Sequence, residues 1–419
     1  MGIEQAVNNQ LNKIPGVKRV VKRCYQGILY ALSPKVKVEG DVRCVSPQDD
    51  RDYFFGYYDK SPWSSNGRYM LCMAAEETWS QPAPDAPLDI LIVDVESGVT
   101  RRIADSRAWN VQQGCMAQWL GPDFNSEVIY NDFREGAYCS VIYNIDTDRE
   151  RLLPQPVYAV TNDGTTALTL DFGRLHTFRP GYGYSSLPDS TKEVKVPEGF
   201  CVWRVDLCSG ECTGLLSYDQ IVSFEPRGEM RGAFHKVNHI MVNPCGNRFM
   251  FLHRWFCGQR KYSRLLTCDL DGENLYCLSD DDMVSHCYWK SDSEIIAFEN
   301  KRDYGHGYYL MKDLTSDYKR LWEALDNDGH PSYSPDRSHV LTDTYPDRRR
   351  LSEVKVLEEG DVTGKEARVV ARVFSPFRYD NDTRCDLHPR WSPDGRSVCF
   401  DAAFEGRRRL YVAPIGEVR

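Results

Sequence analysis

Four of the nine histidines in this 419-residue chain occupy the same position of a repeated sequence pattern. In each copy, the histidine lies four residues before the Ser, Asn or Lys that opens a turn, and a short apolar run follows that turn. The copies begin at His239 (HIMVNPCG), His286 (HCYWKSDS), His330 (HPSYSPDR) and His388 (HPRWSPDG). Imidazoles that meet from separate strands can bind a metal ion or transfer protons. The repeat therefore predicts a metal site or acid–base chemistry, and the alternative is four hydrogen-bonded structural histidines.

An acidic residue accompanies the last of these histidines. Asp386 lies two residues before His388, so both side chains would lie on one face of an extended chain. Imidazole together with a carboxylate or amide oxygen suits Mn, Fe or Zn. Asp386 is therefore a candidate to add an oxygen ligand to a histidine site.

The elements that must position these residues are short strands joined by turns. Seven copies of the pattern can be traced, with turns near Trp63–Gly67, Trp119–Asp123, Val160–Gly164, Val242–Gly246, Trp289–Ser293, Tyr333–Arg337 and Trp391–Gly395. Short strands that repeat about every 40–50 residues are typical of four-stranded propeller blades. We predict an all-β, seven-bladed β-propeller over residues 39–419, with an insertion at 173–199 in the third blade. The innermost strand of each blade starts at one face of a propeller, so the four histidines should line one opening of the central channel.

Residues 1–38 differ in composition from the rest of the chain. They hold seven Lys or Arg residues against Glu4 alone, whereas the whole chain carries a net charge of −9. Apolar residues recur at helical spacing between Val17 and Leu32. The pattern predicts a basic amphipathic helix, which could make peripheral contact with an anionic membrane or pack on the propeller or a partner.

Composition excludes several classes of protein. The acidic body argues against nucleic-acid binding, which depends on neutralising phosphates. No apolar run approaches the ~20 residues that span a bilayer, and no signal-peptide pattern opens the chain, so we expect a cytoplasmic and possible membrane-peripheral location. The fifteen cysteines lack C-x-x-C spacing and are expected to be reduced thiols. The sequence also lacks a P-loop, a G-x-G-x-x-G after a strand and a G-x-S-x-G elbow.

Basic loops are expected on the same face as the histidines. In each blade the loop between the second and third strands should open there, and several of these loops are rich in Arg. They include Arg134, Arg174, Arg179, Arg260–Lys261, Lys301–Arg302, Arg348–Arg350 and Arg407–Arg409. Guanidinium groups bind carboxylates and phosphates through paired hydrogen bonds. We therefore expect an anionic ligand, although each loop taken alone could be a solvated hairpin turn.

The second half of the chain resembles the oligogalacturonate lyases, a family of seven-bladed propellers that bind manganese. The resemblance covers roughly residues 200–419 and rests on WRVDL, H-x-x-x-N-P, SHCYW and HPRWSPDGRSVCFDA. It places His239 at the position of the family's catalytic histidine, and His286 and His388 at two metal-ligand positions. The family's other ligands, a Gln and a second His, are replaced here by Thr383 and Asp386. The first half, with FFGYYDKSPW, WNVQQG and GYGYS, resembles uncharacterised propellers of bacterial surface-polysaccharide gene clusters.

The resemblance implies a metal-assisted lyase that cleaves an acidic, uronate-containing oligosaccharide or polysaccharide by β-elimination. His239 would be the base, and the candidate ligands of a divalent metal ion, with Mn²⁺ expected, are His286, His330, His388 and Asp386. Arg227, Arg231 and His235, on the loop that enters the fourth blade, would bind the substrate carboxylate. Two alternatives are a glycoside hydrolase acting on an acidic glycan and a non-catalytic propeller that binds or assembles glycans in polysaccharide biosynthesis.

Overall fold

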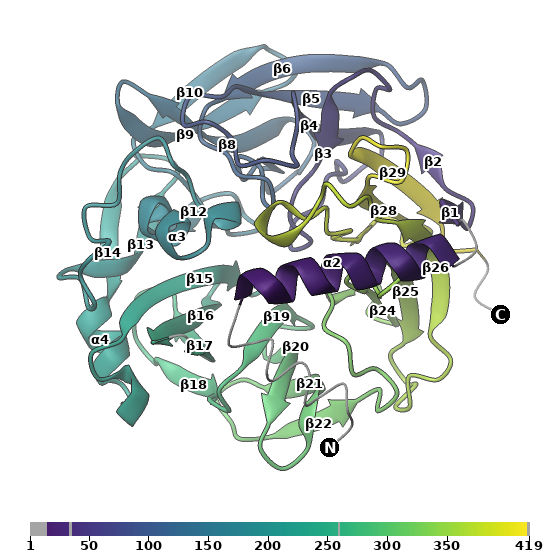
Figure 1. Cartoon of the computed structure of the whole chain (residues 1–419). Helices are drawn as coiled ribbons and strands as arrows, with labels where there is room; N and C mark the ends of the chain where they lie inside the picture. The colour runs from purple at the N-terminus through teal and green to yellow at the C-terminus, as the bar shows by residue number, and fades with distance from the viewer. Residues whose placement is uncertain (1–14, 33–35, 259, 417–419) are drawn as a thin grey trace.

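Seven antiparallel sheets form a closed ring around a central channel (Figure 1). The computed structural model describes residues 15–32, 36–258 and 260–416. The predicted seven-bladed β-propeller is therefore confirmed. The first strand of the repeat in each blade lies at the channel. The residues before this strand lie at one end of the channel, and the repeated turns that follow it lie at the other.

The first four blades follow one another along the chain. Blade 1 contains β3 (Asp52–Phe54), β4 (Tyr69–Ala75), β5 (Leu88–Asp94) and β6 (Thr100–Ser106). Blade 2 contains β7 (Gln118–Trp119), β8 (Glu127–Arg134), β9 (Ala137–Asn144) and β10 (Arg149–Leu153). Blade 3 contains β11 (Ala159–Val160), β12 (Thr166–Thr169), β13 (Phe200–Asp206) and β14 (Cys212–Ser217). Blade 4 contains β15 (Phe234–Val242), β16 (Arg248–Cys257), β17 (Arg260–Asp269) and β18 (Tyr276–Ser279).

The last three blades complete the ring. Blade 5 contains β19 (Val284–Trp289), β20 (Glu294–Lys301), β21 (Gly305–Lys312) and β22 (Tyr318–Leu321). Blade 6 contains β23 (Ser332–Tyr333), β24 (His339–Asp343), β25 (Leu351–Glu358) and β26 (Arg368–Phe374). Blade 7 contains β27 (Arg390–Trp391), β28 (Ser397–Ala402) and β29 (Arg409–Pro414).

Two strands from the start of the chain close the ring against its end. β2 (Arg43–Cys44) pairs with β29 and supplies the fourth strand of blade 7. β1 (Val38–Glu39) pairs with β26 and adds a fifth strand to blade 6. These two pairings tie the start of the chain to its last two blades and so hold the ring closed.

The aromatic residues of the repeated turns hold neighbouring blades together. The indole N–H of Trp289 donates to the Met241 carbonyl of blade 4 at 3.0 Å. Trp119 and Trp391 make equivalent bonds to the carbonyls of Pro62 and Ser332. A buried indole needs an acceptor, so this pairing explains why Trp recurs in the sequence repeat.

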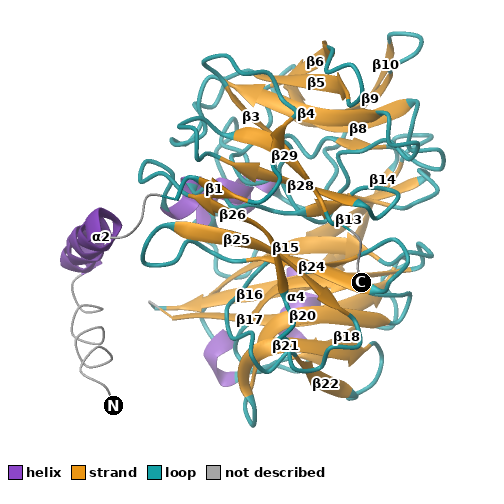
Figure 2. Cartoon of the chain, turned by 90° about the vertical axis from the view of Figure 1, so that its right-hand side faces the viewer, coloured by secondary structure: helices purple, strands orange, loops and turns teal. Residues whose placement is uncertain are grey.

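Few helices accompany the strands. They are α2 (Pro15–Leu32), α3 (Phe172–Phe178), α4 (Tyr218–Ser223) and the short 3-10 turns η1 (Pro180–Tyr182), η2 (Gly228–Met230) and η3 (Asn381–Thr383). α3 and η1 belong to the 173–199 insertion, which connects β12 to β13. α2 lies outside the ring, as the side view shows (Figure 2). Among the described residues, no helix is long and apolar enough to cross a bilayer.

Candidate functional site

The four repeated histidines meet at one end of the channel. Ring centroids are 4.1 Å apart for His286 and His330, 4.4 Å for His330 and His388, and 6.4 Å for His239 and His286. Each of the four residues is at most 6% exposed. We call this set the histidine cluster.

Irregular backbone conformations at His239 and His388 direct these two side chains into the channel. His239 and His388 have φ values of 59° and 42°, in the left-handed region that residues other than glycine rarely adopt. In β15 the pairing register also shifts between Asn238 and Met241, around His239. Such a conformation costs about 1–3 kcal/mol per residue and is concentrated at functional sites.

Three members of the cluster are oriented through Nδ1 by an acceptor. The pairs are His286 with Asp328 (3.0 Å), His330 with Asp343 (2.8 Å) and His388 with the carbonyl of Gly56 (2.8 Å). Carboxylates and carbonyls accept, so Nδ1 carries the proton and Nε2 presents its lone pair. Metal-binding histidines are oriented in this way.

The arrangement fits a divalent metal ion. The Nε2 atoms of His330 and His388 are buried and have no hydrogen-bond partner among the described residues. One ligand atom each from His330, Asp386 and His388 lies within 4.8 Å of the other two. Both Asp386 oxygens accept from Arg384, at 2.5 and 2.9 Å, which keeps the carboxylate ionised. Two free imidazole nitrogens and a carboxylate form a donor set that suits Mn, Fe or Zn, and His286 lies beside His330 as a further candidate.

Carboxylates balance the charge of the cluster. Burial by itself lowers the pKa of His330, but Asp343 and Asp386 outweigh it, so the pKa is raised above its usual value. The pKa of His286 is lowered by burial despite its bond to Asp328. His388, which bonds a neutral carbonyl, has its pKa lowered well below the usual value by burial and by His330.

His239 lies in a different environment from His330, Asp386 and His388. Its Nε2 is 3.1 Å from both the Tyr58 hydroxyl and the Cys287 carbonyl, and its Nδ1 is 3.4 Å from the Tyr57 hydroxyl. The Tyr58 hydroxyl itself donates to the Cys287 carbonyl at 2.7 Å. Burial and the neighbouring His286 lower the pKa of His239 to about 3. His239 is therefore neutral near pH 7, and in the protein without substrate its imidazole is a weak base.

Tyr57 is a central residue that sequence reasoning missed. The centroid of its ring lies 4.9–6.5 Å from those of all four histidines. Tyr182, from the blade 3 insertion, packs against it at 5.8 Å. Burial raises the pKa of Tyr57 well above the usual value, so its hydroxyl stays protonated and can donate. The FFGYYDK segment was noted in the sequence, but Tyr57 precedes the register of the repeat and gave no signal of this role.

A group of cations with few carboxylate partners lies next to the histidine cluster. We call Arg179, Lys236, Arg254 and Lys261 the cationic wall. Lys236 and Arg254 are directly opposite each other on β15 and β16, and like charges opposite each other destabilise a sheet. Arg254 lowers the pKa of Lys261 to about 8, and burial together with Arg254 lowers the pKa of Lys236 well below its usual value.

The cationic wall borders the histidines. The guanidinium of Arg179 stacks over Tyr182, which contacts Tyr57. Arg254 is close enough to lower the pKa of His239. Arg179 is paired only loosely, at 3.6 Å from Asp382. An anionic ligand would relieve the mutual repulsion of these cations.

No hydrogen bond, ion pair or ring contact joins the three residues predicted to bind the carboxylate to the histidine cluster within the described part of the chain. Arg227 forms ion pairs with Asp280 and Asp282, and its guanidinium packs on Trp255. The Nδ1 of His235 is 2.9 Å from the Nε2 of His253, and both rings are buried. Arg231, at the end of η2, is exposed.

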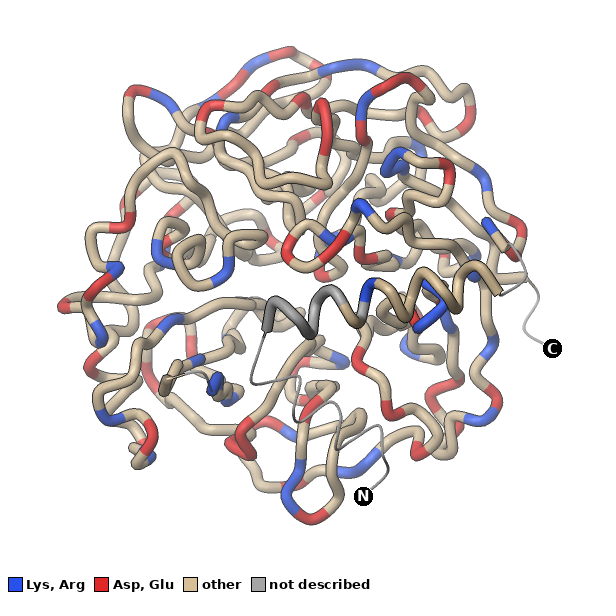
Figure 3. The backbone as a smooth tube through the Cα atoms, in the orientation of Figure 1, with Lys and Arg blue, Asp and Glu red and all other residues tan. Residues whose placement is uncertain are grey.

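Most of the basic loops proved to be structural. Arg174 is 1% exposed and donates to carbonyls of the insertion and of His235, which holds the insertion against blade 4. Arg350 binds the carbonyls of the β26–β27 connection, and Arg408 binds Asp401. Of the loops named from the sequence, those of Arg179 and Lys261 supply two of the four cations of the cationic wall. Elsewhere, acidic and basic residues are interspersed around the ring (Figure 3).

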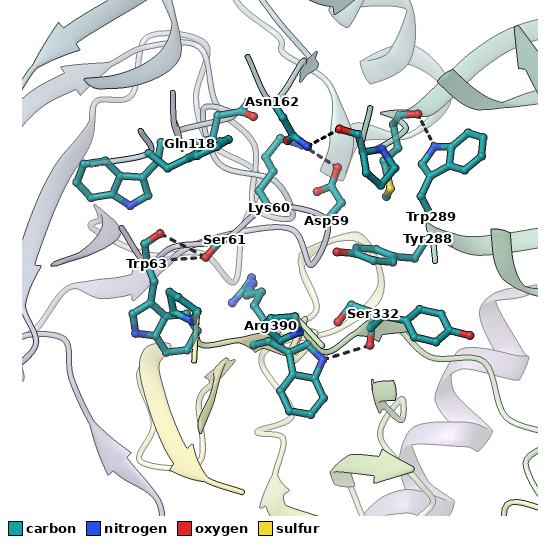
Figure 4. Close-up of a pocket in the computed structure, with 18 of the residues that line it drawn as sticks. Asp59, Lys60, Ser61, Trp63, Gln118, Asn162, Tyr288, Trp289, Ser332 and Arg390 are labelled. Carbon is teal, nitrogen blue, oxygen red and sulfur yellow. Dashed lines mark hydrogen bonds and ion pairs between the residues drawn. The ribbon is translucent and has the colours of Figure 1, made fainter. Parts of the chain in front are cut away.

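A cavity of about 490 Å³ occupies the opposite end of the channel. Its walls come from the turns that follow the inner strands and include Trp63, Trp289 and Arg390, with Asp59 and Lys60 pointing inward (Figure 4). Tyr58 lines this cavity and also contacts His239, so Tyr57 and Tyr58 separate it from the histidine cluster. The cavity and the cluster are thus two different sites.

Neither a family model nor a curated protein matches the sequence. Among solved structures, the chain is similar to an oligogalacturonate lyase in complex with manganese, with a TM-score of 0.66 and 18% identity over 91% of this chain and 97% of that one. An oligogalacturonate lyase from Vibrio parahaemolyticus gives a TM-score of 0.62 and 12% identity over 92% and 98%. A prolyl endopeptidase matches at 0.51 and 10% identity, with only 55% of its own chain covered. These likenesses establish the fold, and the chain is structurally similar to oligogalacturonate lyases along nearly its whole length.

Proposed function

We propose that the protein is a metal-assisted lyase that cleaves an acidic, uronate-containing oligosaccharide or polysaccharide by β-elimination. The observation that carries the proposal is the position of the cationic wall beside a cluster of histidines, two of which have free Nε2 atoms. The cationic wall suits a carboxylate, and the histidine cluster suits proton transfer and a metal ion. Manganese in a similar propeller of known structure supports this choice of metal.

Elimination from a uronate breaks the C5–H and C4–O bonds and forms a C4–C5 double bond. The carboxylate at C5 must be neutralised first, because this acidifies the C5 proton. Arg254, Lys236 and Arg179 would bind that carboxylate. His239, neutral near pH 7, would accept the proton, and the negative charge of a bound uronate beside it would raise its pKa toward the range that a general base needs.

A donor must protonate the oxygen that leaves C4. The hydroxyl of Tyr57 lies within reach of His239 and stays protonated because burial raises its pKa. Tyr57 is therefore the donor in this proposal. His330, His388 and Asp386, with His286 beside them, would hold the metal ion, which when bound supplies positive charge that polarises the substrate carboxylate.

The proposal is tested by incubating the protein with uronate-containing glycans and Mn²⁺ and measuring the ultraviolet absorbance of unsaturated uronate. The expected result is a steady rise that the variant His239→Asn slows by about 10²–10⁴-fold, the contribution of a general base. Asn tolerates the positive φ at this position, so the backbone should be kept. The matched control is His306→Ala, an exposed histidine on β21 that should leave the rate unchanged.

Other outcomes would favour the alternatives. New reducing ends without unsaturation would indicate a glycoside hydrolase. Within the described part of the cluster, however, Asp328, Asp343 and Asp386 are each bound to a His or an Arg, which leaves no free carboxylate pair for hydrolysis. Glycan binding without turnover, unchanged in His239→Asn, would indicate a non-catalytic binding protein.

A further inference from the structure

Helix α2 has one side attached to the propeller and another exposed. Arg23 forms an ion pair with Asp380 at 2.7 Å and donates to the Phe377 carbonyl at 2.8 Å. The ring of Tyr30 stacks on Phe374, with centroids 4.9 Å apart. The sequence left open whether this helix packs on the propeller or contacts a membrane, and these contacts leave a second surface available.

That second surface is apolar. Residues spaced three or four apart lie on one side of a helix, and here they are Val21 (43% exposed), Tyr25 (44%), Ile28 (57%) and Leu32 (79%). We call these four residues the apolar stripe. An exposed apolar strip of this kind marks an interaction surface.

The helix is attached at the histidine end of the channel. Its anchors Phe374, Phe377 and Asp380 border the β26–β27 connection, which leads to His388. Tyr25 borders both surfaces of the helix, because it is 44% exposed and also contacts Arg348 of the β24–β25 connection, which follows Asp343. Figure 1 shows α2 lying across this face of the ring, and Figure 2 shows it standing off from the blades.

The charge of residues 5–38 indicates which kind of surface the apolar stripe contacts. Between residues 5 and 38 the sequence has seven Lys or Arg residues and no Asp or Glu, although the whole chain is acidic. Exposed apolar side chains together with a concentration of cations are characteristic of helices that lie in the surface of anionic bilayers.

We propose that α2 docks the protein on an anionic lipid bilayer through the apolar stripe, with the histidine end of the channel facing that bilayer. Docking in this orientation brings the cluster and the cationic wall close to the lipid headgroups. If the lyase function proposed above holds, on which this second step rests, the preferred substrate is an acidic glycan attached to the bilayer.

The test uses the full chain and flotation with vesicles of phosphatidylcholine containing 30% phosphatidylglycerol. We expect binding that falls at least tenfold in pure phosphatidylcholine, weakens in high salt, and falls at least tenfold in the double variant Ile28→Asp/Leu32→Asp. Both positions are exposed, so the fold should be kept. The matched control is Val99→Asp/Leu314→Asp, two exposed apolar residues in outer hairpins, which should bind like the wild type.

Hydrogen exchange on and off the vesicles tests the orientation. Protection is expected in α2 and in the 344–350 and 375–389 connections, but not at the opposite end of the channel. Absence of binding to the anionic vesicles, or equal binding by the stripe variant, would overturn the proposal. A dimer that the stripe variant disrupts would assign the stripe to a second copy of the chain instead.

The substrate step is tested separately by comparing cleavage of one acidic oligosaccharide free and coupled to a lipid in vesicles. The wild type should cleave the coupled form at least tenfold faster, and the stripe variant should lose this advantage. Equal rates would overturn the substrate step alone. No cleavage of either form would contradict the lyase function, whereas flotation would still decide the docking.

Discussion

Replacing Asp343 by Asn should weaken metal binding without altering any candidate ligand. The Asp343 carboxylate lies 2.8 and 3.0 Å from Nδ1 of His330 and accepts the backbone N–H groups of His330 and His388 at 2.9 and 3.2 Å. It therefore fixes both the tautomer of His330 and the spacing of two candidate ligands. Asn keeps the shape and one acceptor oxygen but removes the charge.

Loss of such a partner typically reduces metal affinity by about 10–100-fold, equivalent to about 1.4–2.7 kcal/mol. The assay is a titration of the metal-free protein with Mn²⁺ by calorimetry, with bound metal measured by mass spectrometry after dialysis. Asp336→Asn, in the exposed turn of the same blade, is the matched control and should bind like the wild type. Equal affinity in Asp343→Asn and the wild type would refute the assignment of His330 and His388 as ligands.

Further predictions concern the ligands, the cationic wall and the blade contacts. His388→Asn should abolish stoichiometric metal binding, measured as metal content after dialysis, whereas retained stoichiometry would exclude His388 as a ligand. Arg254→Ala should raise the pKa of Lys261 from about 8 toward the ordinary value, because Arg254 is the largest cause of the lowered pKa, and NMR titration measures this change. The same variant should bind acidic oligosaccharides more weakly, which calorimetry measures. The folded-state pKa of Lys261 lies below the ordinary value of about 10.4, so the folded protein binds fewer protons than the unfolded chain between these values. The free energy of unfolding should therefore rise between about pH 8 and 10, as Lys261 loses its proton and the repulsion within the cationic wall weakens. Urea unfolding of Lys261→Gln should not show this rise. Trp289→Phe should lower the free energy of unfolding by about 1–3 kcal/mol, because the buried Met241 carbonyl loses its donor, and an unchanged urea midpoint would contradict this.

The propeller and the meeting of its histidines could be predicted because both depend on one repeated register. A residue at the same place in successive blades must face the same channel, so His239, His286, His330 and His388 were placed together without knowledge of any distance. The expectation of an anionic ligand came from the basic loops, and most of the arginines that suggested it bind backbone carbonyls or carboxylates. Sequence gives the position of Arg174, Arg350 and Arg408 in loops but not the direction of their side chains, which are buried.

Residues that act from outside the register could not be placed in the same way. Asp343 follows His330 by 13 residues, and Glu299 and Asp401 follow His286 and His388 at the same spacing. Only Asp343 bonds its histidine, whereas Glu299 pairs with Lys301 and Asp401 pairs with Arg390 and Arg408. The spacing of 13 residues was therefore a usable signal for Asp343. At the other two positions the acidic residue pairs with a nearby Lys or Arg instead of the histidine. Tyr57 and Lys236 had no such signal.

Ring closure has a consequence for the synthesis of this protein. Arg43 pairs with Val412, and Val38 with Val373, so strands made first must wait for strands made last. Until translation ends, β1 and β2 have no partners, and the apolar stripe precedes them on the emerging chain. Contacts between residues so distant in sequence form slowly, and unpaired strand edges are prone to aggregate. If the helix reached a bilayer during this interval, the start of the chain would be held at a surface while the last blade was completed.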